Sequence, residues 1–205
     1  MIKLLYEARV EDGGERVGNL FSALLPEHES FIKKQKLFFV GTAPVNGHIN
    51  ISPKGYDTLR IFSPTEVAYL DLTGSGNETS AHLKENGRIT LMFVSFEGAP
   101  LILRLYGAGR VIVPGTPEWD RLIPHFTLFP GARQIVWADI HAVKTSCGFG
   151  VPLYAYAGDR DTLLQWADKK GEEDLAAFRK KHNTVSIDGI VTHLGERETG
   201  VASSR

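Results

Sequence analysis

Six runs of β-forming residues, joined mostly by short loops, constrain the fold of this chain more than any other feature. They cover residues 36–43, 47–52, 65–72, 88–96, 100–113 and 133–146. Asn46 and Gly47, between the first two runs, form a dipeptide typical of β-hairpin turns. Short loops favour antiparallel pairing, and a sheet that closes on itself has no exposed edges. The sequence therefore predicts an α+β protein, mainly β, built on a six-stranded antiparallel barrel.

Helical patterns flank these runs. Residues 26–35 predict a helix with proline in its first turn, and a short polar helix follows the glycine-rich turn at 74–76. Gly107 and Gly109 interrupt the fifth β run, which indicates a bend or bulge. The tail from about 158 to 190 has helical periodicity, divided into two helices by Gly171. We expect residues 1–205 to form one domain, with the barrel at about 27–150 and this helical tail after it.

Composition excludes several classes of partner. The 205 residues carry 23 Lys and Arg against 24 Asp and Glu, a balance that favours neither nucleic acid nor an anionic membrane surface. No apolar run approaches the roughly 18–20 residues that span a bilayer. The first residues lack the apolar segment of a signal peptide. Cys147 is the only cysteine, so we expect a cytoplasmic protein with one buried thiol.

Several common site motifs are absent from the sequence. There is no P-loop, and the "GSGNET" stretch lacks the third glycine and the context of a dinucleotide-binding turn. No pair of histidines and cysteines has the spacing of a zinc site, so no metal is expected.

The stretch "LTGSGNETSAHLKENGRITLMF" from Leu72 to Phe93 allows two interpretations. Ser75 and Glu78 have the spacing of a capping box, and Asn77 could equally be the N-cap. A helix start surrounded by hydroxyl groups and glycines is also a typical anion site. Such a site needs a nearby cation, and Lys54 stands at the end of the second β run.

Three segments in order resemble the pyridoxamine 5′-phosphate oxidase-like flavoproteins. They are "FFVGTAPVNGHINISPKG", "AYLDLTGSGNETSAHLKENGRITLMF" and "LILRLYGAGRV", and the resemblance continues through "SCGFGVP". It implies a Greek-key split barrel that forms a homodimer and binds FMN in two clefts between the subunits. It also implies that the second strand and the following helix start hold the phosphate and ribityl chain, at Ser52, Lys54, Gly55, Thr73, Gly74, Ser75, Asn77 and Thr79.

The chain departs from the family pattern in two places. Glu78 and Thr79 stand where many members carry basic residues, so the phosphate would rest on amides, hydroxyls and Lys54, or on a basic residue from elsewhere. We expect Glu78 to turn back toward the Ser75 amide. The C-terminus lacks the Trp-Arg-Leu-like segment that takes the substrate phosphate, and residues 183–189 favour a helix end and turn over a substrate loop. Oxidation of pyridoxamine phosphate is therefore not expected.

The resemblance implies an FMN-dependent oxidoreductase that acts on a small organic substrate, with NAD(P)H as a candidate electron donor. Two alternatives stay open: a flavin-binding protein without turnover, and a barrel that binds haem in the same cleft. Arg104, inside an apolar strand, must either reach the cofactor cleft from a second subunit or extend to solvent. The sequence singles out no catalytic residue.

Overall fold

The computed structural model describes residues 18–199, so the expectation about a signal peptide concerns residues outside the described range. The described strands are β1 (Leu20–Phe21), β2 (Phe38–Thr42), β3 (Asn50–Lys54), β4 (Leu59–Ser63), β5 (Glu66–Leu72), β6 (Arg88–Val94), β7 (Ile102–Ile112) and β8 (Ala132–Ser146). The helices are α1 (Pro26–Lys34), α2 (Glu78–Asn86), α3 (Pro117–Leu122), α4 (Thr162–His182) and α5 (His193–Thr199), with a 3₁₀ turn η1 (Ile123–His125).

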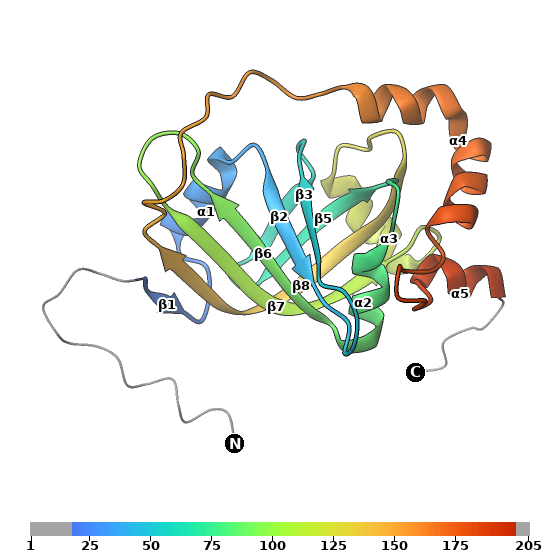
Figure 1. Ribbon diagram of the computed structural model, residues 1–205, viewed down its shortest axis with the longest axis horizontal. Helices are drawn as coiled ribbons and strands as arrows, with labels where there is room; N and C mark the ends of the chain where they lie inside the picture. Colours follow the sequence, from blue (N-terminus) through green and yellow to red (C-terminus); the bar gives the residue numbers. More distant parts are fainter. Residues whose placement is uncertain (1–17, 200–205) are drawn as a thin grey trace, which may run out of the picture.

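The strands form one antiparallel sheet in the order β3-β2-β6-β7-β8-β5-β4, and β1 pairs with β8. This sheet curls around its core, with the helices on its outside (Figure 1). Strands β6, β7 and β8 are consecutive neighbours, and β5 lies beside β8. The long connection from β5 to β6 contains α2. This is a Greek-key order, which confirms the predicted α+β class.

The strand number differs from the prediction, since the described residues contain two more strands than the six expected. The short β4 pairs with β5 through Leu59 and Tyr69, but all five of its residues are only half-buried. Its residues therefore do not alternate between buried and exposed positions, which is the pattern that predicts a strand. Strand β1 has only two residues, which are too few to show an alternating pattern.

Both faces of β5 are buried, which explains its nearly continuous apolar sequence. Val67 and Tyr69 point into the main core inside the curled sheet. Ala68 and Leu70 point outward into a second core, where α3 and η1 cover the sheet with Leu122 and neighbouring aromatic residues. The end of β5 is thereby fixed from both sides, immediately before the glycine-rich loop.

The expected irregularity at Gly107 is present. The register between β7 and β8 shifts between Tyr106 and Gly107. A Cβ atom at Gly107 would lie 2.6 Å from the carbonyl oxygen of Asp139, so the close approach of the two strands requires glycine here.

The tail folds as two helical segments, as predicted. Gly171 has φ 70° and ψ 167°, which breaks the helix within α4 and bends it along the side of the barrel (Figure 1). Leu175 is buried, and the rings of Trp166 and Phe178 contact each other. The tail then continues past the predicted limit into α5, which lies beside α2. The prediction of a buried Cys147 was wrong, because its side chain is exposed.

Candidate functional site

A cleft of about 650 Å³ lies between the end of β3 and the start of α2. Its size is within the usual range for small-molecule and cofactor sites. Eight of the nine residues predicted to hold a cofactor line this one cleft: Ser52, Lys54, Gly55, Thr73, Gly74, Ser75, Asn77 and Thr79. Residues from two separate parts of the sequence thus converge as the resemblance implied.

The loop from residue 73 to 77 is anchored at both ends. Thr73 donates hydrogen bonds to the Gly131 carbonyl oxygen from both its backbone nitrogen and its hydroxyl group, each at 2.8 Å. Asn77 is the N-cap residue of α2, and Gly87 ends the helix in the left-handed conformation with φ 70°. The loop is therefore held in place while Ser75, at its tip, remains exposed.

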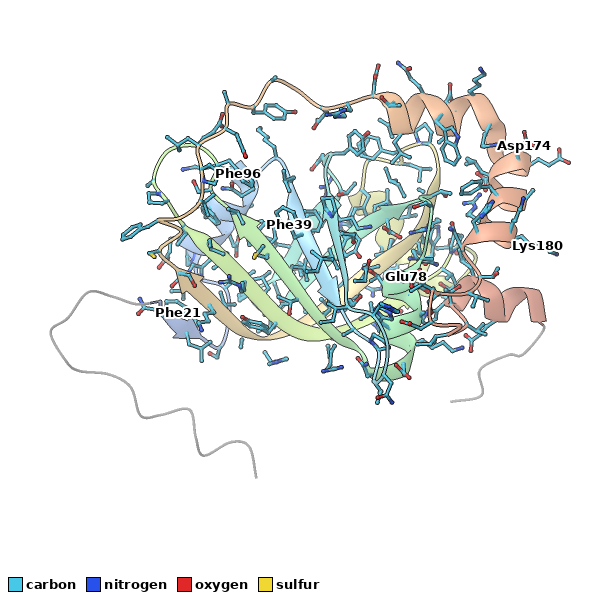
Figure 2. All side chains as sticks on the ribbon, viewed as in Figure 1. Phe21, Phe39, Glu78, Phe96, Asp174 and Lys180 are labelled. Carbon is cyan, nitrogen blue, oxygen red and sulfur yellow. The ribbon has the colours of Figure 1, made fainter. Side chains whose placement is uncertain are left out.

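The expected capping box at the start of α2 does not form. Glu78 Oε2 accepts a hydrogen bond from the backbone nitrogen of Ile187 at 3.0 Å, instead of turning back to Ser75. Figure 2 shows Glu78 at the start of α2, beside the C-terminal segment. Asn77 makes no side-chain cap either, because its Oδ1 accepts from Gln134 Nε2 at 2.8 Å. The helix start therefore has no side-chain cap from the described residues, which favours the anion site over the capped helix.

Three charged side chains meet behind the loop. Lys54 Nζ lies 2.7 Å from Asp71 Oδ1, and Arg133 Nε lies 2.8 Å from Asp71 Oδ2. Burial opposes ionisation of Asp71, but the charges of Arg133 and Lys54 outweigh it and lower the pKa of Asp71 to about 2. Lys54, Arg133 and Asp71 together carry a net charge of +1, and the carboxylate of Glu78 at the start of α2 lines the same cleft.

Sequence reasoning missed Arg133, whose side chain is 5% exposed. In the pairing of β5 with β8, Asp71 stands opposite Gln134 and Leu72 opposite Ala132, so Arg133 is an extra residue in a β-bulge. Bulges next to sites redirect a side chain, and this one places Arg133 in the cleft lining. Arg133 is therefore a candidate for the basic residue from elsewhere in the chain, which stays a prediction. The only sequence signal was a polar pair, Arg133-Gln134, ahead of an apolar strand.

Arg133 also binds the loop and the helical tail. Its Nη1 donates to the Gly76 carbonyl oxygen at 2.9 Å and to Asn183 Oδ1 at 2.8 Å. Among the described residues, the third guanidinium nitrogen, Nη2, has no acceptor. Arg133 can therefore position the loop and still offer a donor to an anion in the cleft.

Two hydroxyl groups of the cleft differ in their partners. Thr79 Oγ1 accepts a hydrogen bond from Asn50 Nδ2 at 3.3 Å. Ser52 Oγ is buried and has no hydrogen-bond partner within the part of the chain described. Since buried hydroxyl groups without a partner are rare in native proteins, Ser52 fits a site in which a ligand supplies the missing partner.

Arg104 does not line this cleft. It lies on β7, and its Nη1 donates to Ser146 Oγ at 3.1 Å. The idea that Arg104 reaches a cofactor from a second subunit stays a prediction.

The C-terminal segment forms one wall of the cleft. Residues 183–189 end α4 and make the predicted turn, in which Gly189 donates to the Ser186 carbonyl oxygen. Ile187 from this turn also lines the cleft. Asp188 accepts hydrogen bonds from the backbone nitrogen and Nδ1 of His48, at 2.8 and 2.6 Å. The sequence contained no signal for this long-range contact with the β2–β3 connection.

Two kinds of feature are absent from the described residues. Within residues 18–199, no group of His, Cys, Asp and Glu side chains could hold a metal ion. No helix in that range has the length and apolar character that a membrane span requires.

Comparisons with known proteins identify the family of the chain. A family model described as pyridoxamine 5′-phosphate oxidase matches residues 24–147, more than half of the chain. The pyridoxamine 5′-phosphate oxidase family protein ustO of Aspergillus flavus is 38% identical over 188 residues, which cover 82% of this chain and 75% of that protein.

Solved structures with low sequence identity also match. HupZ of Group A Streptococcus has a TM-score of 0.45 and 21% identity, over 58% of this chain and 91% of that chain. The FAD binding protein from Mycobacterium smegmatis has a TM-score of 0.42 and 15% identity, over 61% and 96%. The assignment rests on the two sequence matches: this chain belongs to the pyridoxamine 5′-phosphate oxidase family.

Proposed function

We propose that the chain binds FMN in this cleft and is an FMN-dependent oxidoreductase. The observation that carries the proposal is the convergence of Lys54, Arg133 and the uncapped start of α2 at one end of the cleft. Two cations beside backbone N–H groups at a helix start suit a terminal phosphate. FMN ends in such a group.

The residues divide into two sets by what they would hold. Lys54, Arg133 and Thr79 would hold the phosphate together with the amides of the loop at 74–77. The unpartnered hydroxyl group of Ser52 would serve the ribityl chain or the phosphate. FMN supplies hydride or electron transfer when bound, while the protein binds it, orients it and shapes the face open to substrate.

The substrate is proposed to be a small molecule other than pyridoxamine phosphate, with NAD(P)H as a candidate electron donor. The C-terminal turn presents the apolar side chain of Ile187 to the cleft. An apolar side chain offers no hydrogen-bond donor to a substrate phosphate.

A homodimer is part of the proposal. A groove of about 500 Å³ on the outer face of β2, β3 and β6 is lined largely by apolar side chains, among them Phe39, Ile49, Ile51 and Met92. Ile49 and Ile51 are 73% and 69% exposed. Ile49 also lines the cofactor cleft, so a second copy on this face would close the cleft. Exposed apolar patches of this kind mark interaction surfaces.

Lys54→Ala tests the phosphate site. The change removes one of the two cations at this end of the cleft. Charge-assisted hydrogen bonds contribute roughly 1.5–3 kcal/mol, so FMN should bind the variant about 10- to 150-fold more weakly. Riboflavin, which lacks the phosphate, should bind both proteins almost equally in fluorescence titrations of apo-protein.

Lys33→Ala is the matched control, since Lys33 makes only an exposed pair with Glu29 on α1. It should change neither affinity. If Lys54→Ala weakens the binding of FMN and riboflavin equally, or weakens neither, Lys54 does not hold the phosphate. Steady-state NAD(P)H oxidation with dye acceptors then separates an oxidoreductase from a flavin-binding protein without turnover.

A further inference from the structure

Asn183 connects the helical tail to the loop of the cofactor cleft. Its side chain is completely buried. Oδ1 accepts a hydrogen bond from Arg133 Nη1 at 2.8 Å, and Nδ2 donates to the Gly74 carbonyl oxygen at 3.0 Å. One amide group therefore holds both the cation and the loop that would surround a phosphate.

A role in ending α4 does not account for this side chain. Asn183 is the C-cap residue of α4, but the cap contact is made by its backbone nitrogen, which donates to the Arg179 carbonyl oxygen at 2.8 Å. Any residue except proline supplies that nitrogen. The buried amide side chain makes its contacts with the cleft instead.

The rest of the segment docks on the same end of α2. Ile187 binds Glu78 through its backbone nitrogen. His193 binds Ser80 Oγ through its backbone nitrogen at 3.1 Å and its Nδ1 at 3.0 Å. All these tail residues lie beyond residue 147, where the match to the family model ends. The tail of this chain thus completes a site whose other walls lie within the matched region.

We infer that Asn183 is a positioning residue for the cofactor phosphate, and that docking of the tail and binding of the phosphate are coupled. The inference rests on the proposed function. Asn183 fixes Arg133 Nη1 and the loop before the ligand arrives, which lowers the entropic cost of binding. Coupling between two equilibria is reciprocal, so a bound phosphate must also stabilise the docked segment from 183 to 193.

The test uses the full-length apo-protein and two probes, FMN and riboflavin, with the variants Asn183→Ala and Asn183→Asp. Loss of hydrogen bonds to a cation and to the loop should weaken FMN binding by about 5- to 30-fold in Asn183→Ala. Asn183→Asp keeps the size of the side chain but places a negative charge on Arg133, so its loss for FMN should be larger. Riboflavin affinity should change by less than about 2-fold in both variants, because riboflavin has no phosphate for Arg133 to bind.

Asn86→Ala is the matched control. Asn86 is the last residue of α2, at the end of that helix away from the cleft. Its side chain donates to the Ala43 carbonyl oxygen at 2.8 Å. It should leave both affinities unchanged. A purely structural role for Asn183 would weaken both flavins equally, and that result would overturn the inference.

Hydrogen exchange provides a second readout that does not depend on the variants folding. In the wild-type protein, FMN should slow amide exchange in residues 183–193 more than riboflavin does at equal occupancy. Equal protection by the two flavins would contradict the coupling. If the wild-type protein binds neither flavin, the proposed function fails; if it binds FMN but the Asn183 variants match the wild type, only this inference fails.

Discussion

Arg133 Nε lies 2.8 Å from Asp71 Oδ2, although Arg133 has no paired residue on β5. The bulge that leaves Arg133 unpaired turns its side chain toward the carboxylate of the neighbouring strand. Asp71 also binds Lys54 and Gln134. A buried carboxylate with three partners thus holds both cations of the cleft in place.

Arg133→Ala should destabilise the protein by about 3–5 kcal/mol, because breaking a buried ion pair leaves a charge without its main partner. Lys54 remains beside Asp71, which places the expected loss at the lower end of that range. Urea unfolding of the apo-protein measures it. Arg121→Ala, which removes an exposed arginine paired with Glu118, should cost less than about 1 kcal/mol. Equal losses of unfolding free energy in the two variants would show that the buried pair stabilises the protein no more than the exposed pair does.

Acid should remove the contribution of Asp71. Its pKa is about 2 in the folded protein against 3.8 for a free side chain, so the unfolded chain takes up the proton first as pH falls. The stabilisation is complete above about pH 5 and is lost as pH falls toward 2, by about 2 kcal/mol. The difference in unfolding free energy between wild type and Asp71→Asn should shift by that amount over this range. Parallel pH profiles would refute the assignment.

Gly107→Ala should destabilise the barrel by about 1–3 kcal/mol, because the new methyl group meets the Asp139 carbonyl oxygen at 2.6 Å and the strands must separate. Gly150→Ala is the control, since a Cβ atom at Gly150 has no neighbour within 4 Å among the described residues. Thermal unfolding of both variants checks the prediction. A Gly107→Ala variant as stable as Gly150→Ala would mean that the strands can separate at no cost.

The homodimer should depend on the groove over β2 and β3. Ile51→Glu places a charge on a side chain that is 69% exposed, where a second copy would bury it, so the variant should become monomeric at micromolar concentration. Leu128→Glu, at a similarly exposed leucine that does not line the groove, should leave the dimer intact. Light scattering measures both. A wild-type mass near 22.6 kDa with cofactor bound would contradict the proposed dimer.

Local sequence patterns predicted most of the fold, and the family resemblance predicted much of the candidate site. The six predicted strands, α1 and the break at Gly171 follow from residue periodicity and from glycine, which act over a few neighbouring residues. The convergence of Lys54 with the loop after β5 was expected from a resemblance, and the cleft brings them together. The strands and helices needed no knowledge of contacts between distant segments, whereas the convergence came from the resemblance alone.

Contacts between distant segments explain what the sequence did not reveal. Arg133 enters the cleft only because a bulge shifts its register against β5. Glu78 has a capping-box spacing, but the backbone nitrogen of Ile187, 109 residues away, takes its carboxylate. The sequence predicts only a helix end at Asn183, and its contact with the loop at Gly74 is seen only in the structure. The contacts of Glu78 and Asn183 depend on how the tail packs against the barrel.

The identity of the bound cofactor tests the central claim most directly. Mass spectrometry of the small molecule released by heating freshly purified protein should return FMN, from a yellow sample with a flavin absorption spectrum. The cations at Lys54 and Arg133 and the uncapped start of α2 suit a terminal monophosphate. FAD or haem at near-full occupancy, or no cofactor after incubation with FMN, would contradict the account.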